Sequence, residues 1–391
     1  MIKSQKAVIN KLCPASCLHN YDEIPAPHIQ LEARLSTTHA PCPKLDDQIS
    51  LSEVNVAINS MKVNSAPGLD QIGYQIIWIL PSSLLIVLTD IFNRLLDEGI
   101  FPSSWKQSLV ILVPKPHGGG ARPTSLLSCF LKVLEKMVYW RINWFLEHNC
   151  IIPEHQSGFR KGKSCTNNLV ALSSFIHAGL ANKEFVACVF LDIEGAFDNV
   201  IPSILMQDLI EIGIPIRLRK FVSNLITERE LFFVVEGRRE GPFRVHKGTP
   251  QGSTLNPTLF NIYLRKITTQ VNQKTQILSY ADDLVMFASS PCLEEAHNLE
   301  QEAVNQIHIF LTDRGLDLSP HKSQHIVFTR STQRISSNPI IKIDDRLVPK
   351  VEMVRFLGVW FDSEMKGNAH IDHLIKRGRK LVDIITSLAG V

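Results

Sequence analysis

The chain has 391 residues, of which 45% are hydrophobic and 20% are charged. This length predicts two or three subdomains and excludes a small disulfide-stapled scaffold, and the composition is typical of a folded chain rather than a disordered one. Lys and Arg number 41 against 38 Asp and Glu, a formal charge of +3. A charge this small does not by itself indicate a nucleic-acid partner, although local basic clusters could supply one.

The eight cysteines are neither dense nor regularly paired, so we expect no disulfide framework. Cys13 and Cys17 with His19 lack a second pair at zinc-finger spacing, and we assign no zinc there. The most apolar stretch is IIWILPSSLLIVL, which Pro81 interrupts, so it predicts a buried helix pair and not a membrane span. No secretory signal is visible. We therefore expect an intracellular protein, in the cytoplasm, the nucleus or both, that is not secreted and has no membrane partner.

The first half of the chain is predicted to be mostly helical. Residues 1–48 carry five prolines without sustained periodicity and predict an irregular lead-in. A helix is predicted to begin at Ser50, because Glu53 stands at capping-box spacing. The segments SLVILVPKP and ARPTSLLS predict a strand hairpin around a Gly-rich turn. Two further helices are predicted in LKVLEKMVYWRINWFLEH and NNLVALSSFI.

From residue 185 the pattern changes to a sheet with helices against it. The run EFVACVFLD is almost wholly apolar and rich in β-branched residues, as in a buried central strand. Further strands are predicted in LFFVVEG, ILSYADDLVMFA, SQHIVFTR and VRFLGVWFD. Between them, CLEEAHNLEQEAVNQIHIFLTDRG predicts a helix, because its acidic start and its Arg314 near the end suit the helix dipole.

Three carboxylates stand at the ends of apolar strands. Asp192 ends the run FVACVFL, and a hairpin in ILSYADDLVMFA would place Asp282 and Asp283 at its tip. One aspartate alone is more often a cap or a surface acid at a turn. Three converging carboxylates, however, repel one another unless cations neutralise them. Oxygen-only ligands favour Mg²⁺ or Mn²⁺, and two such ions indicate phosphoryl chemistry.

The motifs around these acids resemble a known family. LDIEGAFD, HKGTPQGSTLNPTLFNIYL and YADDLVMF occur in this order and are similar to motifs A, B and C of reverse transcriptases, specifically those of non-LTR (LINE-type, jockey-like) retrotransposons. APGLD, FPSSWKQSLVILVPKP, RPTSLLSCFLKVLEK and HQSGFRKGKS resemble that family's fingers blocks. GLDLSPHKSQHIVF and VRFLGVWFD resemble motifs D and E.

The resemblance implies an α+β fold: a right-hand polymerase with helical fingers, an antiparallel-sheet palm and only the start of a thumb. After the lead-in of residues 1–48, we expect the fingers in 49–184 and the palm, with motifs A to D, in 185–350. Motif E and the start of a truncated thumb are expected in 351–391.

The resemblance also implies residue roles at the reaction centre. Asp192, Asp282, Asp283 and the Ile193 carbonyl are implied ligands of two Mg²⁺ ions, with Mn²⁺ as the alternative. Phe197 is the implied steric gate, whose ring excludes a ribose 2′-hydroxyl and so selects deoxynucleotides.

Other implied roles concern the incoming nucleotide. Gln251 and Gly252 of GTPQGS are implied nucleotide contacts, and Lys115 and Arg122 would hold the triphosphate. Lys322 is the implied general acid that protonates pyrophosphate. Without the motifs around them, these residues would be assigned to solvated loops.

Two basic clusters are candidates for binding nucleic-acid backbones. Such clusters are more often solvated surface when seen alone, but these lie beside the polymerase motifs. Their members are Phe159, Arg160, Lys161 and Lys163, and then Arg238, Arg239, Arg244 and Lys247.

The implied function is that of an RNA-directed DNA polymerase, a nucleotidyltransferase that uses an RNA template, a DNA primer and deoxynucleoside triphosphates. Two alternatives remain open at this point. One is a catalytically inactive, truncated retroelement relic that still binds nucleic acid. The other is a reverse transcriptase like the maturases of group II introns.

Overall fold

The computed structural model describes residues 9, 12–13, 43–114, 121–235, 237–330 and 340–389. Most of the expected lead-in, and Lys115 with the Gly-rich turn after it, lie outside these residues. The chain divides into two compact units. The first unit comprises Met1–Ile152 and Gly195–Leu264, and the second comprises Pro153–Glu194 and Arg265–Val391. Both mix helices and strands, which confirms the predicted α+β class.

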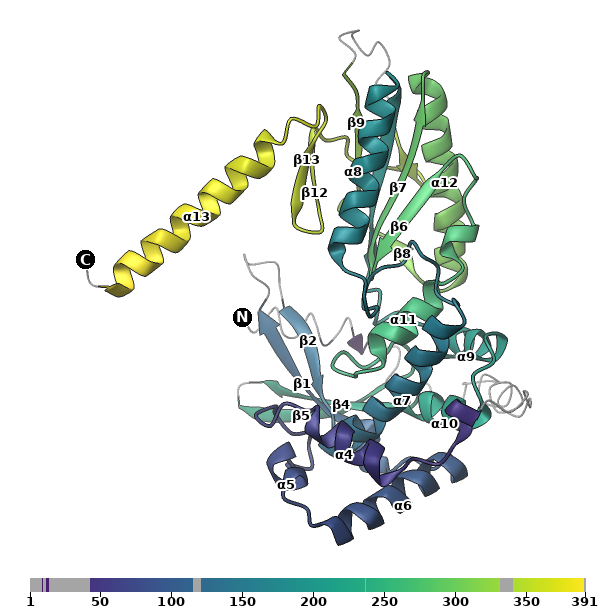
Figure 1. Cartoon of the computed structure of the whole chain (residues 1–391), viewed down its shortest axis with the longest axis vertical. Coiled ribbons are helices and arrows are strands. Elements are labelled where there is room, and N and C mark those ends of the chain that lie inside the picture. The colour runs from purple at the N-terminus through teal and green to yellow at the C-terminus, as the bar shows by residue number, and fades with distance from the viewer. Residues whose placement is uncertain are drawn as a thin grey trace. The chain divides into compact units, whose positions relative to one another are not determined.

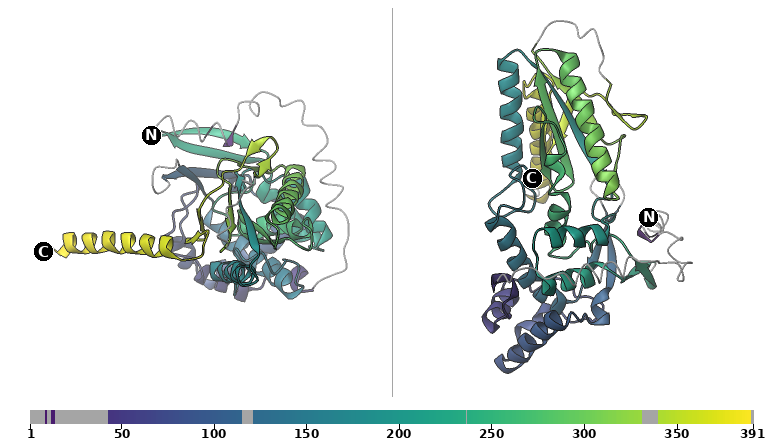
Figure 2. Two further views of the ribbon diagram at one scale, coloured as in Figure 1. Left: turned by 90° about the horizontal axis from the view of Figure 1, so that it is seen from above. Right: turned by 90° about the vertical axis from the view of Figure 1, so that its right-hand side faces the viewer.

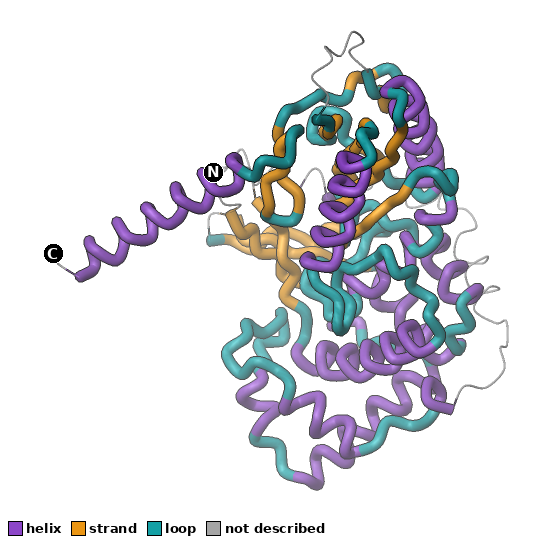
Figure 3. Tube along the Cα trace, turned by 45° about the horizontal axis from the view of Figure 1, so that its top comes forward, coloured by secondary structure: helices purple, strands orange, loops and turns teal. Residues whose placement is uncertain are grey.

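Helices make up most of the first unit (Figure 3). The predicted capping box is present at the start of α4, where Ser50 and Glu53 bond to each other's backbone. The helices are α3 (Pro43–Asp46), α4 (Leu51–Asn59), α5 (Tyr74–Trp78), α6 (Ser82–Glu98), η2 (Ser103–Lys106), α7 (Cys129–His148), α9 (Pro202–Glu211), α10 (Ile216–Ile226) and α11 (Asn256–Leu264).

The helix pair predicted in IIWILPSSLLIVL forms as α5 and α6, but the prediction that it is buried is wrong. Ile79 is 79% exposed, and Ile86 and Val87 are each 51% exposed. On α6 the buried apolar positions are Phe92 and Leu96, four residues apart. A helix packed on one side buries a single stripe, so the other apolar side chains of α6 remain at the surface of the described structure.

A four-stranded mixed sheet completes the first unit. The predicted hairpin is confirmed, because β1 (Gln107–Pro114) and β2 (Ala121–Leu126) pair antiparallel. β1 also pairs in parallel with β4 (Arg229–Val235), which pairs antiparallel with β5 (Arg238–Val245). The order is therefore β2-β1-β4-β5, and it joins segments that are distant in the chain.

The second unit is built on a five-stranded antiparallel sheet. Its central strand is β3 (Phe185–Glu194), the apolar run that predicted a buried strand. β3 pairs on one edge with β7 (Asp283–Ser290), which pairs with β6 (Gln276–Tyr280). On its other edge it pairs with β8 (Asp317–Leu318) and β9 (Gln324–Phe328).

Helices cover both faces of this sheet (Figures 1 and 2). α8 (Cys165–Ala181) lies on one face and α12 (Leu293–Asp313) on the other. Val186, Cys188 and Phe190 of β3 pack with Leu172 and Ile176 of α8 in one core cluster. Because β3 is covered on both faces, the side chains that point to either face are apolar, which explains its unbroken hydrophobic run.

The segment VRFLGVWFD was predicted as one strand, and this is wrong. It forms a hairpin of β12 (Met353–Phe356) and β13 (Val359–Asp362). The two residues between the strands, Leu357 and Gly358, have φ angles of 45° and 90°. Two positive φ angles in a two-residue loop are the geometry that joins antiparallel strands tightly. The turn was not predicted, because the apolar residues on both sides of it read as one continuous strand.

The remaining elements of the second unit are short, apart from the last helix. They are η4 (Ile267–Thr269), β10 (Lys342–Ile343), β11 (Arg346–Leu347) and α13 (Asn368–Ala389). Among the described residues, we find no helix that combines the length and the apolar content needed to cross a bilayer.

Candidate active site

The structure brings the three predicted carboxylates together in the second unit. In the antiparallel pairing of β3 with β7, Asp192 stands directly opposite Asp283. On the other side of β7, Asp283 pairs with Tyr280 of β6. The turn between these strands is therefore Ala281 and Asp282, and Ala281 has a φ of 60° that permits the tight reversal. Strand register alone thus gathers three acids at one end of the sheet.

The carboxylates interact electrostatically. Partial burial and, after it, the charges of Asp282 and Asp192 raise the pKa of Asp283 from 3.8 to about 6. Asp283 as a whole is exposed, so solvent screens part of this repulsion. A site in which like charges oppose one another's ionisation is one that a cation would stabilise.

Lys322 is a cation that the chain itself places at this site. Its Nζ lies 3.2 Å from Oδ2 of Asp192. The loop before it is tied to β3, because Ser319 N donates to the Asp192 carbonyl at 2.9 Å and Asp192 N donates to Ser323 Oγ at 3.2 Å. The pair is exposed, so it adds little stability. It does, however, hold an ammonium group beside Asp192.

The donors at this end of the sheet fit a hard divalent cation. Asp192, Asp282 and Asp283 offer only carboxylate oxygens, which Mg²⁺ and Mn²⁺ prefer. Ile193 follows Asp192 on β3 and lies opposite Leu318 of β8, so its backbone is fixed next to the acids. Burial and, after it, the neighbouring carboxylates raise the pKa of Asp283, and a bound cation would favour its ionised form against both.

A loop that was predicted to bind nucleic acid also supports the carboxylate hairpin. Ser157 N donates to the Ser279 carbonyl and Ser279 N donates to the His155 carbonyl, each at 3.0 Å. Next to this pairing, a Cβ on Gly158 would lie 2.4 Å from Ala281 N. Only a residue without a side chain fits there. Sequence reasoning missed this role, although the glycine before the aromatic residue of HQSGFRKGKS was its one visible signal.

The basic residues after this loop differ in their surroundings. Phe159 is 48% exposed and packs loosely on Tyr280, with ring centroids 6.5 Å apart. Arg160 donates to the backbone carbonyls of Pro153 and Gln156, so it helps to hold the loop's shape. Lys163 pairs with Glu154 at 2.8 Å, whereas Lys161 is exposed.

Phe197 belongs to the first unit, although it follows Asp192 by five residues in the chain. Its ring packs on Phe260 of α11 with centroids 4.7 Å apart. Its carbonyl accepts hydrogen bonds from the backbone N and the hydroxyl of Thr249, at 2.8 and 3.2 Å. The backbone of Phe197 is therefore tied to the segment that carries Gln251.

Gln251 and Gly252 are tied to the β1–β2 hairpin. Ser125 N of β2 donates to the Gln251 carbonyl at 2.6 Å, and Gln251 Nε2 donates to Asp198 Oδ1 at 2.8 Å. Gly252 has a φ of +128°, and a Cβ there would lie 2.4 Å from the Ser125 carbonyl oxygen. A small pocket opens beside them. Its lining includes Pro123, Ser125, Asp198, Asn199, Thr249 and Gln251.

The remaining basic candidates lie on the mixed sheet of the first unit. Arg122 is exposed on β2, opposite Val113. Arg244 lies 3.3 Å from Glu230, and Lys247 donates to Asn199 at 2.9 Å. The four candidates that lie on β5 or just after it are all exposed: Arg238, Arg239, Arg244 and Lys247.

A buried acid that sequence reasoning missed positions the segment after Gln251. Glu135 lies in the middle of α7 and is fully buried. It accepts a hydrogen bond from Leu255 N at 3.0 Å and another from the Ser253 hydroxyl. Burial raises the pKa of its carboxyl group. A lone glutamate on the apolar face of LKVLEKMV was the signal that could have revealed it.

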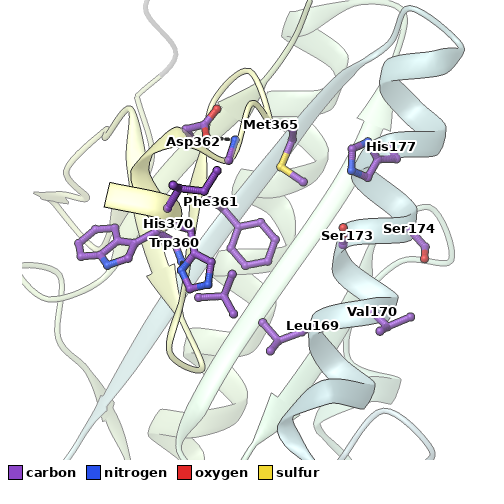
Figure 4. Close-up of a pocket in the computed structure, with 13 residues that line it drawn as sticks. Leu169, Val170, Ser173, Ser174, His177, Trp360, Phe361, Asp362, Met365 and His370 are labelled. Carbon is purple, nitrogen blue, oxygen red and sulfur yellow. Dashed lines mark hydrogen bonds between the residues drawn. The ribbon is translucent and has the colours of Figure 1, made fainter. Parts of the chain in front are cut away.

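A pocket in the second unit lies elsewhere. It has a volume of about 520 Å³ and lies between α8 and the segment that runs from β13 into α13 (Figure 4). Its lining includes Leu169 of α8, Phe361 of β13 and Met365. None of the predicted site residues lines it.

Comparison with known proteins gives consistent matches. Residues 113–361 match the family described as reverse transcriptase (RNA-dependent DNA polymerase). The RNA-directed DNA polymerase from mobile element jockey of Drosophila funebris is 29% identical over 339 residues, which cover 84% of this chain and 37% of the relative. The probable RNA-directed DNA polymerase from transposon BS of Drosophila melanogaster is 26% identical over 340 residues, with the same coverage. The chain thus spans little more than a third of the length of these relatives.

Replacing Gly158 by Ala should lower the free energy of unfolding by about 1–3 kcal/mol, because the added methyl group would collide with the backbone of the Tyr280–Ala281 turn. Chemical denaturation measures the change. Gly378→Ala is the matched control, since nothing lies within 4 Å of its Cβ position, and it should be neutral or slightly stabilising. Equal stabilities for the two variants would contradict the close contact.

The stability of the metal-free protein should depend on Asp283 in a defined pH range. Its pKa is raised to about 6 in the folded chain, so the folded state holds the proton longer than the unfolded state does. Stability is therefore lost as the pH rises from about 4 to about 6. Above that range, Asp283→Asn should stabilise the protein by about 1 kcal/mol, a value reduced by solvent screening.

Thermal unfolding in a chelating buffer at pH 4 and at pH 7.5 measures this effect. The melting temperatures of the original protein and Asp283→Asn should differ at pH 7.5 and should be similar at pH 4. An Asp283→Asn variant that is less stable than the original protein at pH 7.5 would contradict the raised pKa of Asp283.

Proposed function

Because the chain belongs to the reverse transcriptase (RNA-dependent DNA polymerase) family, we propose that it catalyses RNA-directed DNA synthesis. In this reaction a primer 3′-hydroxyl attacks a deoxynucleoside triphosphate opposite an RNA template, and pyrophosphate leaves. The observation that carries the proposal is the meeting of Asp192, Asp282 and Asp283 at one end of the β3–β7 pair. The names of the non-LTR relatives support it.

The proposal includes a right-hand architecture. The antiparallel sheet of the second unit, with the acids at its end, fits a palm. The β1–β2 hairpin and the helices around it fit the fingers. The β12–β13 hairpin fits motif E, and α13 fits the start of a thumb.

Asp192, Asp282, Asp283 and the Ile193 carbonyl would hold two Mg²⁺ ions, with Mn²⁺ as the alternative. When bound, such ions activate the attacking hydroxyl and stabilise the leaving oxygens. The contribution of the chain is to fix these oxygens on paired strands, where the sheet register and the tight hairpin keep them from separating. Their repulsion in the absence of a cation is consistent with this role.

Lys322 would act as the proton donor. Its ammonium group lies 3.2 Å from Asp192, on a loop that two hydrogen bonds tie to β3. A protonated amine beside the carboxylates can give its proton to the departing pyrophosphate and balance the charge that develops there.

The first unit would select and hold the nucleotide. The Phe197 ring, fixed against Phe260, would exclude a 2′-hydroxyl. Gln251 and Gly252 would contact the nucleotide from the loop that is tied to β2. Lys115 and Arg122 would hold the triphosphate through charge-assisted hydrogen bonds.

The exposed basic residues would bind the RNA template and the DNA primer through phosphates, so that binding weakens steeply with salt. Lys161, Arg238 and Arg239 are exposed and suit this role best. The other basic candidates form hydrogen bonds or ion pairs with protein groups, and they are Arg160, Lys163, Arg244 and Lys247. We place the protein in the cytoplasm, the nucleus or both, where both nucleic acids occur.

Primer extension on an RNA template with Mg²⁺ and deoxynucleotides tests the proposal. The original protein should extend the primer, and Asp282→Asn should reduce extension about 1000-fold or more, since losing a metal ligand costs several kcal/mol of transition-state stabilisation. Asp345→Asn is the matched control, an exposed acid in the same unit, and should retain activity. Salt-sensitive binding of nucleic acid without any extension would instead indicate an inactive relic.

Replacing Phe197 by Val should raise ribonucleotide incorporation, relative to deoxynucleotide incorporation, by about tenfold or more, because a smaller side chain leaves room for the 2′-hydroxyl. Single-nucleotide insertion kinetics measure the ratio. Phe197→Tyr keeps the ring and should keep the discrimination. If Phe197→Val left the ratio unchanged, Phe197 would not be the gate.

A further inference from the structure

A buried cluster of two histidines and a glutamate lies in the second unit, away from the three aspartates. His297 and Glu300 stand three residues apart on α12, and therefore on the same face of that helix. His325 is the second residue of β9, on the sheet that α12 covers. One ligand atom from each of the three side chains lies within 4.8 Å of the others.

The glutamate of this cluster lies between the two histidines. His325 Nδ1 lies 3.1 Å from Glu300 Oε1, and His297 Nδ1 lies 3.9 Å from Glu300 Oε2. The side chains of Glu300 and His325 have no exposed surface, and that of His297 is 17% exposed. The Glu300 carboxylate is thus enclosed between two imidazoles, and His297 is the one of the three side chains that reaches solvent.

Several polar atoms in the cluster lack a hydrogen-bond partner among the described residues. They are Glu300 Oε2, His297 Nδ1 and His325 Nε2. Buried polar atoms without partners are uncommon, because each loses its hydration without compensation. Two of these atoms, Glu300 Oε2 and His297 Nδ1, face each other within the cluster. A cation bound between Glu300 Oε2 and His297 Nδ1 would give both atoms a partner.

We propose that His297, Glu300 and His325 bind one divalent transition-metal ion, for which Zn²⁺ is the representative. Two imidazoles and one carboxylate form a donor set that Zn²⁺ accepts with water in the fourth position. Ligand atoms around a tetrahedral Zn²⁺ lie about 3.3 Å apart, so only side-chain adjustments are needed to close the cluster. Imidazole ligands disfavour Mg²⁺, which separates this site chemically from the aspartates.

The ion would join α12 to the edge of the sheet that carries the aspartates. β9 pairs with β3, and His325 stands opposite Val189, three residues before Asp192. α12 supplies the other two ligands from the covering layer. Metal binding therefore stabilises the packing on which the aspartate end of β3 rests. The role is structural, and it does not depend on the polymerase proposal.

The test uses the full chain, from which transition-metal ions have been removed. Excess Mg²⁺ is then added so that the aspartates are occupied. Adding Zn²⁺ should raise the melting temperature by about 3 °C or more. His297→Gln and Glu300→Gln should each abolish this rise. His308→Gln is the matched control on α12, since His308 pairs with Asp344 outside the cluster, and it should keep the rise.

Co²⁺ provides a second readout, because a site with four ligands gives visible absorption bands and an oxygen-only, six-coordinate site gives weak ones. These bands should appear in the original protein and be absent from His297→Gln. His297 is partly exposed, so this variant should fold. The proposal is overturned if Zn²⁺ does not raise the melting temperature, or if His297→Gln responds as the original protein does. A rise that Asp282→Asn removes and His297→Gln retains would also overturn it.

Discussion

The antiparallel pairing of β3 with β7 is the constraint on which the rest of this site depends. It places Asp192 opposite Asp283, and the turn that precedes β7 adds Asp282. Both strands are covered on their two faces, so a slip by one residue would turn every side chain to the opposite face and disrupt the packing on both sides of the sheet. The free energy of the hydrophobic core therefore holds together three carboxylates that would otherwise separate.

Several smaller contacts support the groups that are proposed to react. Gly158 lets a polar loop pack against the carboxylate hairpin. Ser319 and Ser323 tie the loop of Lys322 to the end of β3. Within the first unit, buried Glu135 fixes the segment that follows Gln251. Each of these contacts joins segments that are distant in the chain, and each acts on the position of a reacting group rather than on the reaction itself.

The second unit contains two sets of candidate metal ligands with different chemistry. The aspartates at the end of β3 and β7 offer oxygen only and reach solvent, so they suit ions that enter and leave with substrate. The proposed cluster of His297, Glu300 and His325 is largely buried and offers two imidazoles with its carboxylate, a donor set that suits a transition-metal ion. Burial and donor type thus distinguish two candidate metal sites within a single unit.

The sequence by itself determined most of the elements that form and which residues are candidates for the chemistry. The buried strand β3 and the Ala-Asp-Asp turn could be predicted, because hydrophobic periodicity and turn composition depend on residues that are close together in the chain. Only the tertiary structure decided which distant residues are in contact. It set the contacts of Gly158 with the Tyr280–Ala281 turn and of Glu135 with Ser253 and Leu255. It also placed His325 beside Glu300 of α12 and left one face of α6 exposed. These depend on pairing between distant segments, and a single sequence carries no local pattern that records such pairing.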